Sequence, residues 1–206
     1  MNKKILVISA GTVHPNLMSV YRLKQLLKEK KKNDYIFTTK LSSLTDLAND
    51  QISAVILYFQ KKRIPEPYLE ALERFVFNGG GLLALHSASA SFKQNQRYFN
   101  LIGGRFIKHG KISEFKVEVA DTQSMIYKGI SSFSVRDELY LHEYQKDVSV
   151  HFSTKVDDKI EPVVWTRELG KGKIAYCSLG HCAPVLKNQH VKSIIHQSLD
   201  WMDHCD

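Results

Sequence analysis

Residues 79–89 read Gly-Gly-Gly-Leu-Leu-Ala-Leu-His-Ser-Ala-Ser, and this stretch decides the fold that we expect. The glycines stop a preceding helix, and a short apolar strand follows that ends abruptly at His86. Such a strand-to-helix turn lifts one side chain above the carboxyl end of a parallel sheet, where open α/β sheets bind ligands. In nucleophile-elbow enzymes this side chain is Ser or Cys. His86 can instead move a proton or bind a metal, and it is a poor covalent nucleophile.

The residues before this stretch alternate between strand and helix patterns. Apolar runs at 5–9, 35–38 and 54–59 predict strands, and amphipathic segments at 15–32, 42–49 and from Pro67 onward predict helices. The run at 54–59 is continuously apolar, as in a strand covered on both faces. This alternation predicts an α/β fold with a mostly parallel central sheet flanked by helices.

The second half of the chain has a different pattern. We expect strands at 115–119, 133–142, 150–156, 162–167 and 173–178, and a closing helix at 190–203. Strands at such short spacing predict an antiparallel extension of the sheet.

Length and composition favour one domain spanning residues 1–206, because 206 residues with 43% hydrophobic content can build a substantial core. No apolar run reaches the length of a membrane span, so we expect no membrane partner. The cysteines, Cys177, Cys182 and Cys205, are odd in number and lack paired short spacings. They predict no disulfide framework, and a reduced, cytoplasmic setting fits best.

The net charge of +8 raises the question of nucleic-acid binding. The basic residues gather in two places, at 28–32 and at 61–63. The first group lies at the end of a predicted helix, where positive charges complement the helix dipole, and the second follows a strand. Neither group alternates with aromatic residues as a base-stacking platform would. We therefore expect solvated basic faces and no nucleic-acid partner.

Several glycine and cysteine motifs are excluded by their spacing. The turn after the first strand, at 11–14, lacks the three-glycine dinucleotide fingerprint, and Gly170-Lys171-Gly172-Lys173 lacks phosphate-loop spacing. A cysteine-dependent glutamine amidotransferase needs a thiol at the elbow, and position 86 is His.

The histidines are the strongest candidates for chemistry, because four of the nine follow predicted strands or occupy loops beside them. His14 and His86 follow strands of the parallel half, His109 occupies a loop before a strand, and His181 follows the strand at 173–178. Loops at this sheet edge make sites. An acidic candidate, Glu138, lies in Asp137-Glu138-Leu139-Tyr140-Leu141-His142. If that segment is extended, Glu138, Tyr140 and His142 share one face.

These blocks, taken in order, resemble the trehalose-utilisation ThuA-like family. The resemblance is carried by residues 79–89, by Leu101-Ile102-Gly103-Gly104-Arg105-Phe106 with His109, by Asp137-Glu138-Leu139-Tyr140, and by the closing segments 162–167, 170–173 and 179–181. The resemblance implies a class I glutamine amidotransferase-like, flavodoxin-like three-layer fold. It also implies a role in sugar catabolism, with trehalose or related glycosides as the substrate class.

The resemblance also implies 3-keto sugars as intermediates of some such pathways, and the chemistry that we expect on them is acid–base or metal-assisted. A ketone at C3 of a sugar acidifies the C2 proton, and a base that removes it lets the C1 oxygen leave. We expect His86 or His181 as base, Glu138 as orienter or ligand and Tyr140 as donor. The group that stabilises the enolate oxygen is either a divalent metal such as zinc held by His109, Glu138 and His181, or the hydrogen bonds of these residues alone, and the sequence leaves both open. His14, Trp165 and His142 are the expected substrate-binding residues.

The sequence leaves two alternatives open. A noncatalytic sugar- or partner-binding module would use the same pocket, with Trp165 and Tyr140 stacking on a sugar ring. Glutamine hydrolysis is disfavoured by the missing elbow cysteine. Self-association into a homo-oligomer also stays open, since no stripe of residues identifies an interface.

Overall fold

The structure, a computed structural model, describes residues 4–9, 15–30, 32–48 and 51–203. The predicted substrate-binding residue His14 lies outside the described residues. No helix in the described part of the chain is long and apolar enough to cross a membrane.

A nine-stranded sheet forms the centre of the molecule, in the order β2-β1-β3-β4-β11-β10-β9-β6-β7. Its first five strands in this order run parallel. They are β2 (Asp34–Thr38), β1 (Lys4–Ile8), β3 (Ile52–Leu57), β4 (Gly81–Leu85) and β11 (Gly172–Cys177). Because β4 and β11 are parallel neighbours, the residues that follow both strands meet at one edge of the sheet.

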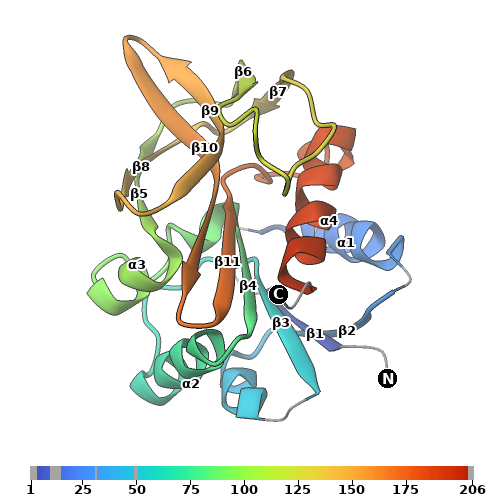
Figure 1. Cartoon of the computed structure of the whole chain (residues 1–206), viewed down its shortest axis with the longest axis vertical. Helices are drawn as coiled ribbons and strands as arrows, with labels where there is room; N and C mark the ends of the chain where they lie inside the picture. The colour runs from blue at the N-terminus through green and yellow to red at the C-terminus, as the bar shows by residue number, and fades with distance from the viewer. Residues whose placement is uncertain (1–3, 10–14, 31, 49–50, 204–206) are drawn as a thin grey trace.

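The other strands extend the sheet antiparallel, as the sequence predicts. They are β10 (Lys159–Leu169), β9 (Ser149–Val156), β6 (Ser113–Val119) and β7 (Phe133–Asp137). A separate antiparallel pair, β5 (Gly104–His109) and β8 (Tyr140–Tyr144), packs beside them. Figure 1 shows the β9–β10 hairpin projecting beyond the parallel strands.

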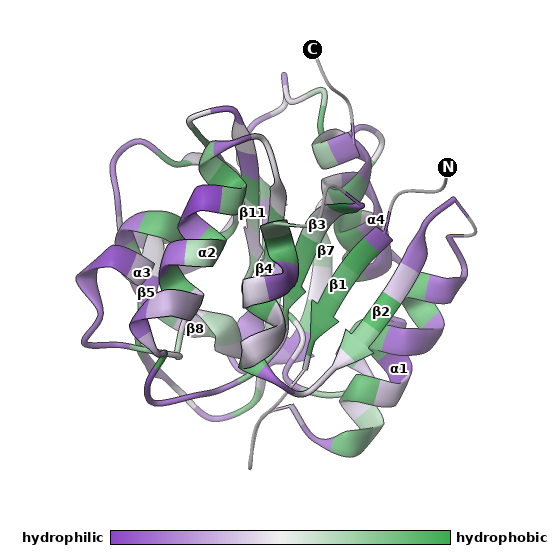
Figure 2. Ribbon diagram, turned by 90° about the horizontal axis from the view of Figure 1, so that it is seen from below, coloured by the Kyte–Doolittle hydropathy of each residue, from purple (hydrophilic) through white to green (hydrophobic). Residues whose placement is uncertain are grey.

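Helices cover both faces of the parallel strands (Figures 1 and 2). One face carries α1 (Leu17–Lys28) and α4 (Gln189–Asp203); the other carries α2 (Glu66–Phe77), α3 (Gln96–Ile102) and the 3₁₀ helix η1 (Leu41–Ala48). A short 3₁₀ turn, η2 (His86–Ala88), directly follows β4, and another, η3 (Val185–Lys187), directly precedes α4.

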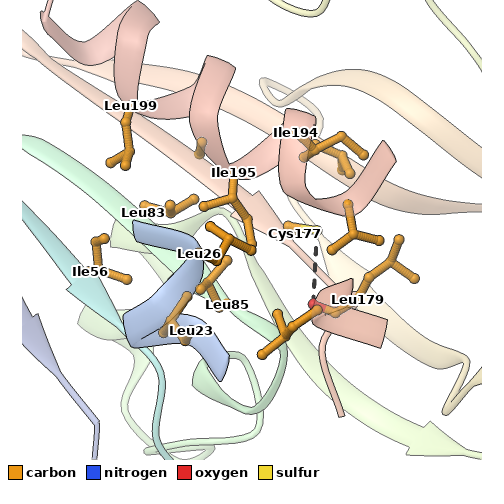
Figure 3. Packing of buried hydrophobic residues seen from close by; sticks show 14 of the residues in the cluster. Leu23, Leu26, Ile56, Leu83, Leu85, Cys177, Leu179, Ile194, Ile195 and Leu199 are labelled. Carbon is orange, nitrogen blue, oxygen red and sulfur yellow. Dashed lines mark hydrogen bonds between the residues drawn. The ribbon is translucent and has the colours of Figure 1, made fainter. Parts of the chain in front are cut away.

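The core has two halves because successive residues of a strand point to opposite faces. In β4, Leu83 and Leu85 face α1 and α4, whereas Leu82 and Ala84 face α2 and α3. Figure 3 shows the first half, in which Leu23 and Leu26 of α1 meet Ile194, Ile195 and Leu199 of α4 over the strands. The continuously apolar strands of the sequence are therefore those covered on both sides.

Three elements differ from the sequence expectation. The predicted strand at 133–142 is interrupted after Asp137, so Glu138 lies between β7 and β8 and shares no strand face with Tyr140 and His142. His109, expected in a loop, ends β5. The short helix α3 is not predicted by the sequence pattern.

Candidate functional site

His86 sits at the elbow that the sequence predicts. It directly follows β4 and begins η2, and its backbone φ is +42°, in the left-handed region that side chains other than glycine rarely adopt. Its ring is buried, with 1% exposed. Such conformations persist only where surrounding contacts stabilise them, and residues that adopt them cluster at functional sites.

One hydrogen bond fixes the orientation of the His86 ring. Nδ1 lies 2.7 Å from the carbonyl oxygen of Ser178, which follows β11. Because a carbonyl can only accept, Nδ1 carries the proton, and in the neutral ring Nε2 offers its lone pair. Nε2 lies 3.6 Å from Oε2 of Glu138.

Glu138 is the centre of the cluster. Its Oε2 lies 3.0 Å from Nδ1 of His181, and its Oε1 lies 3.8 Å from Nδ1 of His109. Burial alone would raise the pKa of Glu138, but the contact with His86 and the charges of His181 and His109 together lower it. The carboxylate is therefore kept ionised between imidazoles.

His86, Glu138 and His181 form a compact donor set. One ligand atom of each lies within 4.8 Å of the other two. Two imidazole nitrogens and one carboxylate oxygen match the ligands of catalytic zinc sites, and the bond from His86 Nδ1 to a backbone carbonyl is the outer contact that such ligands usually make. The residues therefore fit a divalent cation, with His86 in the place that we expected for His109.

His109 lies at the edge of the cluster. Its side chain is 39% exposed, and its Nδ1 also contacts the carbonyl oxygen of Gly110 at 2.7 Å. Its ring stacks on that of Tyr140, and its nitrogen approaches Glu138, but it does not belong to the three-residue donor set.

Tyr140 closes one side of the site. Its ring centroid lies 4.1 Å from that of His86 and 4.3 Å from that of Phe106. Burial raises the pKa of its hydroxyl, and the nearby carboxylates of Glu138 and Asp137 add to this. Tyr140 is therefore protonated at neutral pH and can donate a hydrogen bond.

Asp137 ties two loops of the site together. Its buried carboxylate accepts from the backbone N–H of Glu138 at 2.9 Å and from that of Gly180 at 2.8 Å. Burial raises the pKa of Asp137, although His86 and these two backbone bonds oppose the shift. The carbonyl of Gly180 in turn accepts from the Tyr58 hydroxyl at 2.5 Å. The sequence places Asp137 beside Glu138 but does not reveal this bridging role.

A second layer of polar groups lies behind His86. The Tyr176 hydroxyl donates to the His86 carbonyl at 3.0 Å and lies 2.7 Å from Oγ of Ser89. Nε2 of His142 lies 3.0 Å from the same hydroxyl, and its Nδ1 lies 3.0 Å from Oε1 of Glu161. Sequence reasoning missed Tyr176, Ser89 and Glu161, because nothing local to them signals contacts across the sheet.

Two predicted substrate-binding residues have other roles. Trp165 has no exposed surface, stacks on Tyr176 at 4.1 Å between ring centroids, and donates its indole N–H to the carbonyl of Ile102 at 2.9 Å. The His142 side chain is likewise fully buried, within the second layer. Both rings are therefore covered by protein in this structure, and their contact with a substrate stays a prediction.

The site joins the two halves of the chain. The loops after β4 and β11 supply His86 and His181, and the antiparallel half supplies Glu138, Tyr140 and His109. A hollow of about 680 Å³ elsewhere on the molecule is lined by residues of α2, α3 and β10, and none of the site residues lines it.

Comparison with known proteins agrees with this architecture. The sequence matches the family described as ThuA, trehalose utilisation, over residues 4–202. No curated protein matches it. A ThuA-like protein from Parabacteroides merdae superposes with a TM-score of 0.87 at 18% identity, covering 98% of this chain and 90% of the other. A ThuA-like protein from Bacteroides uniformis gives 0.79 at 19%, covering 98% and 91%.

A more distant likeness is to a much larger protein. The β-galactosidase from Bacillus circulans sp. alkalophilus superposes with a TM-score of 0.68 at 16% identity, covering 98% of this chain but 31% of the other. At such identities the superpositions concern the fold alone, whereas the family match rests on the sequence from residue 4 to residue 202. The chain therefore belongs to the ThuA (trehalose utilisation) family.

Proposed function

We propose that this protein is a sugar-processing enzyme of carbohydrate utilisation whose reaction centre is His86, Glu138 and His181. The observation that carries the proposal is the convergence of these three side chains from three separate loops. The family description supports a role in carbohydrate utilisation, and trehalose-derived or related glycosides are the substrate class we favour. The strand order β2-β1-β3-β4-β11 supports an amidotransferase-like, three-layer domain spanning the chain.

The donor set suits a divalent cation such as zinc, held by Nε2 of His86, Nδ1 of His181 and the carboxylate of Glu138. When bound, such a cation supplies a Lewis acid that polarises a carbonyl oxygen. The anchored ring of His86 and the bridging carboxylate of Asp137 keep the three ligands in place.

Protein side chains supply the remaining chemistry. In a 3-keto glycoside, a base removes the C2 proton, the electron pair moves into the C1–C2 bond, the C1–O bond breaks, and the departing oxygen takes a proton from the protonated base or from water. Where no cation is bound, His181 is the better placed of the two candidate bases, because its side chain is 14% exposed whereas that of His86 is 1% exposed. Glu138 then accepts from Nδ1–H of His181, so that the Nε2 lone pair can take the proton. The protonated hydroxyl of Tyr140 can donate to a developing oxyanion.

The test combines metal content with turnover. We expect about one divalent metal per chain in protein purified without chelator. We expect the wild-type protein to turn over a 3-keto glycoside. We expect His86→Ala and Glu138→Gln each to lose the metal and to abolish this turnover. His190→Gln, on α4 outside the cluster, is the control and should retain both.

Two outcomes would contradict parts of the proposal. Full turnover by metal-free protein that depends on His181 removes the metal and leaves acid–base chemistry. Sugar binding without turnover, unchanged in His86→Ala, identifies a noncatalytic sugar-binding protein instead.

A further inference from the structure

We propose that a second ligand site, for a neutral saccharide, lies in the 680 Å³ hollow between α2, α3 and the end of β10. Its volume is within the range of small-molecule sites. The inference does not depend on the proposed reaction, because the hollow shares no residue with the His86 centre.

The hollow lies toward the opposite end of the parallel strands from the reaction centre. Leu169, which lines it, pairs with Gly172 at the start of β11, and the next residue of β11 pairs with Gly81 at the start of β4. His86 follows the other end of β4. Figure 1 shows α2 and α3 beside this lower part of β10 and β11.

A buried arginine forms part of the lining. Trp165, Arg167 and Leu169 alternate along β10 and share one sheet face, yet the middle position is Arg167, which is only 8% exposed. Buried arginines are rare and need partners. Nη1 of Arg167 donates to Oε1 of Gln145 at 2.8 Å, and Nη2 donates to Asp147 at 2.7 Å. The guanidinium is therefore held rigidly at a position where an apolar residue would ordinarily pack.

Amides continue this polar wall. Oδ1 of Asn100 accepts from Nε2 of Gln145 at 2.8 Å, and the Asn100 carbonyl accepts from Arg167. These planar side chains hold one another in fixed orientations through their hydrogen bonds. Binding of sugar hydroxyls, which both donate and accept, therefore costs little side-chain entropy.

The charges of the hollow largely cancel. Arg97 pairs with Glu73, with Nε 3.1 Å from Oε1, and also with Glu66. Arg167 pairs with Asp147. Since the guanidinium groups of Arg97 and Arg167 already have carboxylate partners, and Arg74 and Glu70 add one charge of each sign to the lining, the hollow has no strong field to select an anion. Hydroxyl groups, which both donate and accept, fit this lining better.

Phe77 supplies an apolar surface at the edge of the hollow. Its side chain is 60% exposed, although it is large and aromatic. It lies against Gly170, where an added Cβ would come within 2.8 Å of the ring and 2.5 Å of the Phe77 carbonyl oxygen. The glycine supports one side of the ring and leaves much of it open to stack on the C–H face of a pyranose.

The test is titration of the full chain with trehalose, a neutral disaccharide, followed by amide chemical shifts. We expect shifts at Phe77, Asn78, Asn100 and Leu101. We expect affinity to fall at least tenfold in Phe77→Ala and to be preserved in Phe77→Tyr and in His86→Ala. Phe77 is exposed, so the melting temperature should show that Phe77→Ala remains folded.

The proposal would be overturned by the absence of shifts at these amides up to molar trehalose, by an affinity that is unchanged in Phe77→Ala, or by binding of glucose 6-phosphate at these amides without binding of trehalose. Shifts confined to residues 178–182 would also overturn it while leaving the proposed reaction centre intact. Conversely, if the proposed reaction at His86 proves wrong, saccharide binding at Phe77 is unaffected.

Discussion

At the scale of single residues, the strained backbone of His86 shows how the site is held. A left-handed conformation at a residue other than glycine costs about 1–3 kcal/mol. The contacts that offset this cost act on both ends of the residue: Ser178 holds the ring, and Tyr176 and Ser89 donate to its carbonyl oxygen. The elbow is therefore positioned by residues of β11 and of its own turn.

Tyr176→Phe tests this support. The substitution leaves the ring packing but removes a hydroxyl that contacts Ser89, His142 and the His86 carbonyl. Losing buried partners of this kind costs about 1–3 kcal/mol. Urea unfolding should show this loss, and turnover and metal affinity should fall with it.

The matched control is Tyr127→Phe, whose buried hydroxyl contacts Ser198 at 2.9 Å, on α4 and away from the elbow. It should lose stability without losing activity. Equal loss of activity in both variants would mean that Tyr176 acts only through general stability.

Glu138→Gln tests the charge at the centre of the site. Because the folded pKa of Glu138 is lowered, its carboxylate contributes stability above its unfolded pKa of about 4.5, and this contribution is lost as the pH falls through the lower folded value. With chelator present, the wild-type protein should therefore exceed Glu138→Gln in unfolding free energy by about 1–2 kcal/mol at pH 7. The difference should shrink toward pH 3.5, and a difference that is constant with pH would contradict the assignment.

At the scale of elements, the sequence predicts the regular parts and misses the short ones. The strands of the parallel sheet are recognisable because burial on both faces leaves continuous apolar runs, as at Val55–Phe59. Helix α3 has seven residues, too few for a periodic pattern, and β5 carries a half-exposed, mixed sequence. The break between β7 and β8 is invisible locally, because it is stabilised by Asp137 binding the N–H of Gly180, 43 positions away.

The junction between α2 and β11 gives a prediction at this scale. A Cβ on Gly172 would lie 1.9 Å from the carbonyl oxygen of Val76 and 2.8 Å from that of Gly80. Both obstacles are backbone atoms, so the helix end and the strand would have to separate. Gly172→Ala should cost about 3 kcal/mol or more in urea unfolding.

Gly110→Ala is the matched control for this junction, because no atom lies within 4 Å of its added Cβ. Its unfolding free energy should stay within about 0.5 kcal/mol of the wild type. A similar loss in both variants would point to a general effect of replacing glycine.

At the scale of the whole molecule, the site exists only because the two halves of the sheet are joined. The strand ends that carry His86 and His181 follow from parallel pairing, so the sequence could place these two residues at one edge. The position of Glu138 depends on the path from β7 to β8, which no periodicity encodes. Trp165 illustrates the same limitation: its residue type suits stacking on a sugar, but its position on β10 directs the side chain into the core.

Buried histidines should make the whole fold sensitive to acid. Burial lowers the pKa of His142, His151 and His196 below the ordinary value of about 6.5. As the pH falls below 6.5, the unfolded chain therefore binds more protons than the folded chain, and the unfolding free energy decreases. Each histidine whose protonation is fully suppressed adds a slope of about 1.4 kcal/mol per pH unit.

His151 allows this slope to be assigned. Its Nε2 lies 2.7 Å from Oγ1 of Thr166, a contact that Gln can replace without titrating. Urea unfolding of His151→Gln between pH 7 and pH 5 should show a shallower loss of stability than the wild type. Thr166→Val removes the same contact but keeps the histidine, so its stability should be lower at pH 7 and its pH dependence should persist. If the unfolding free energy of His151→Gln falls with pH as steeply as that of the wild type, the His151 ring titrates equally in the folded and unfolded states. The acid sensitivity then arises from other groups.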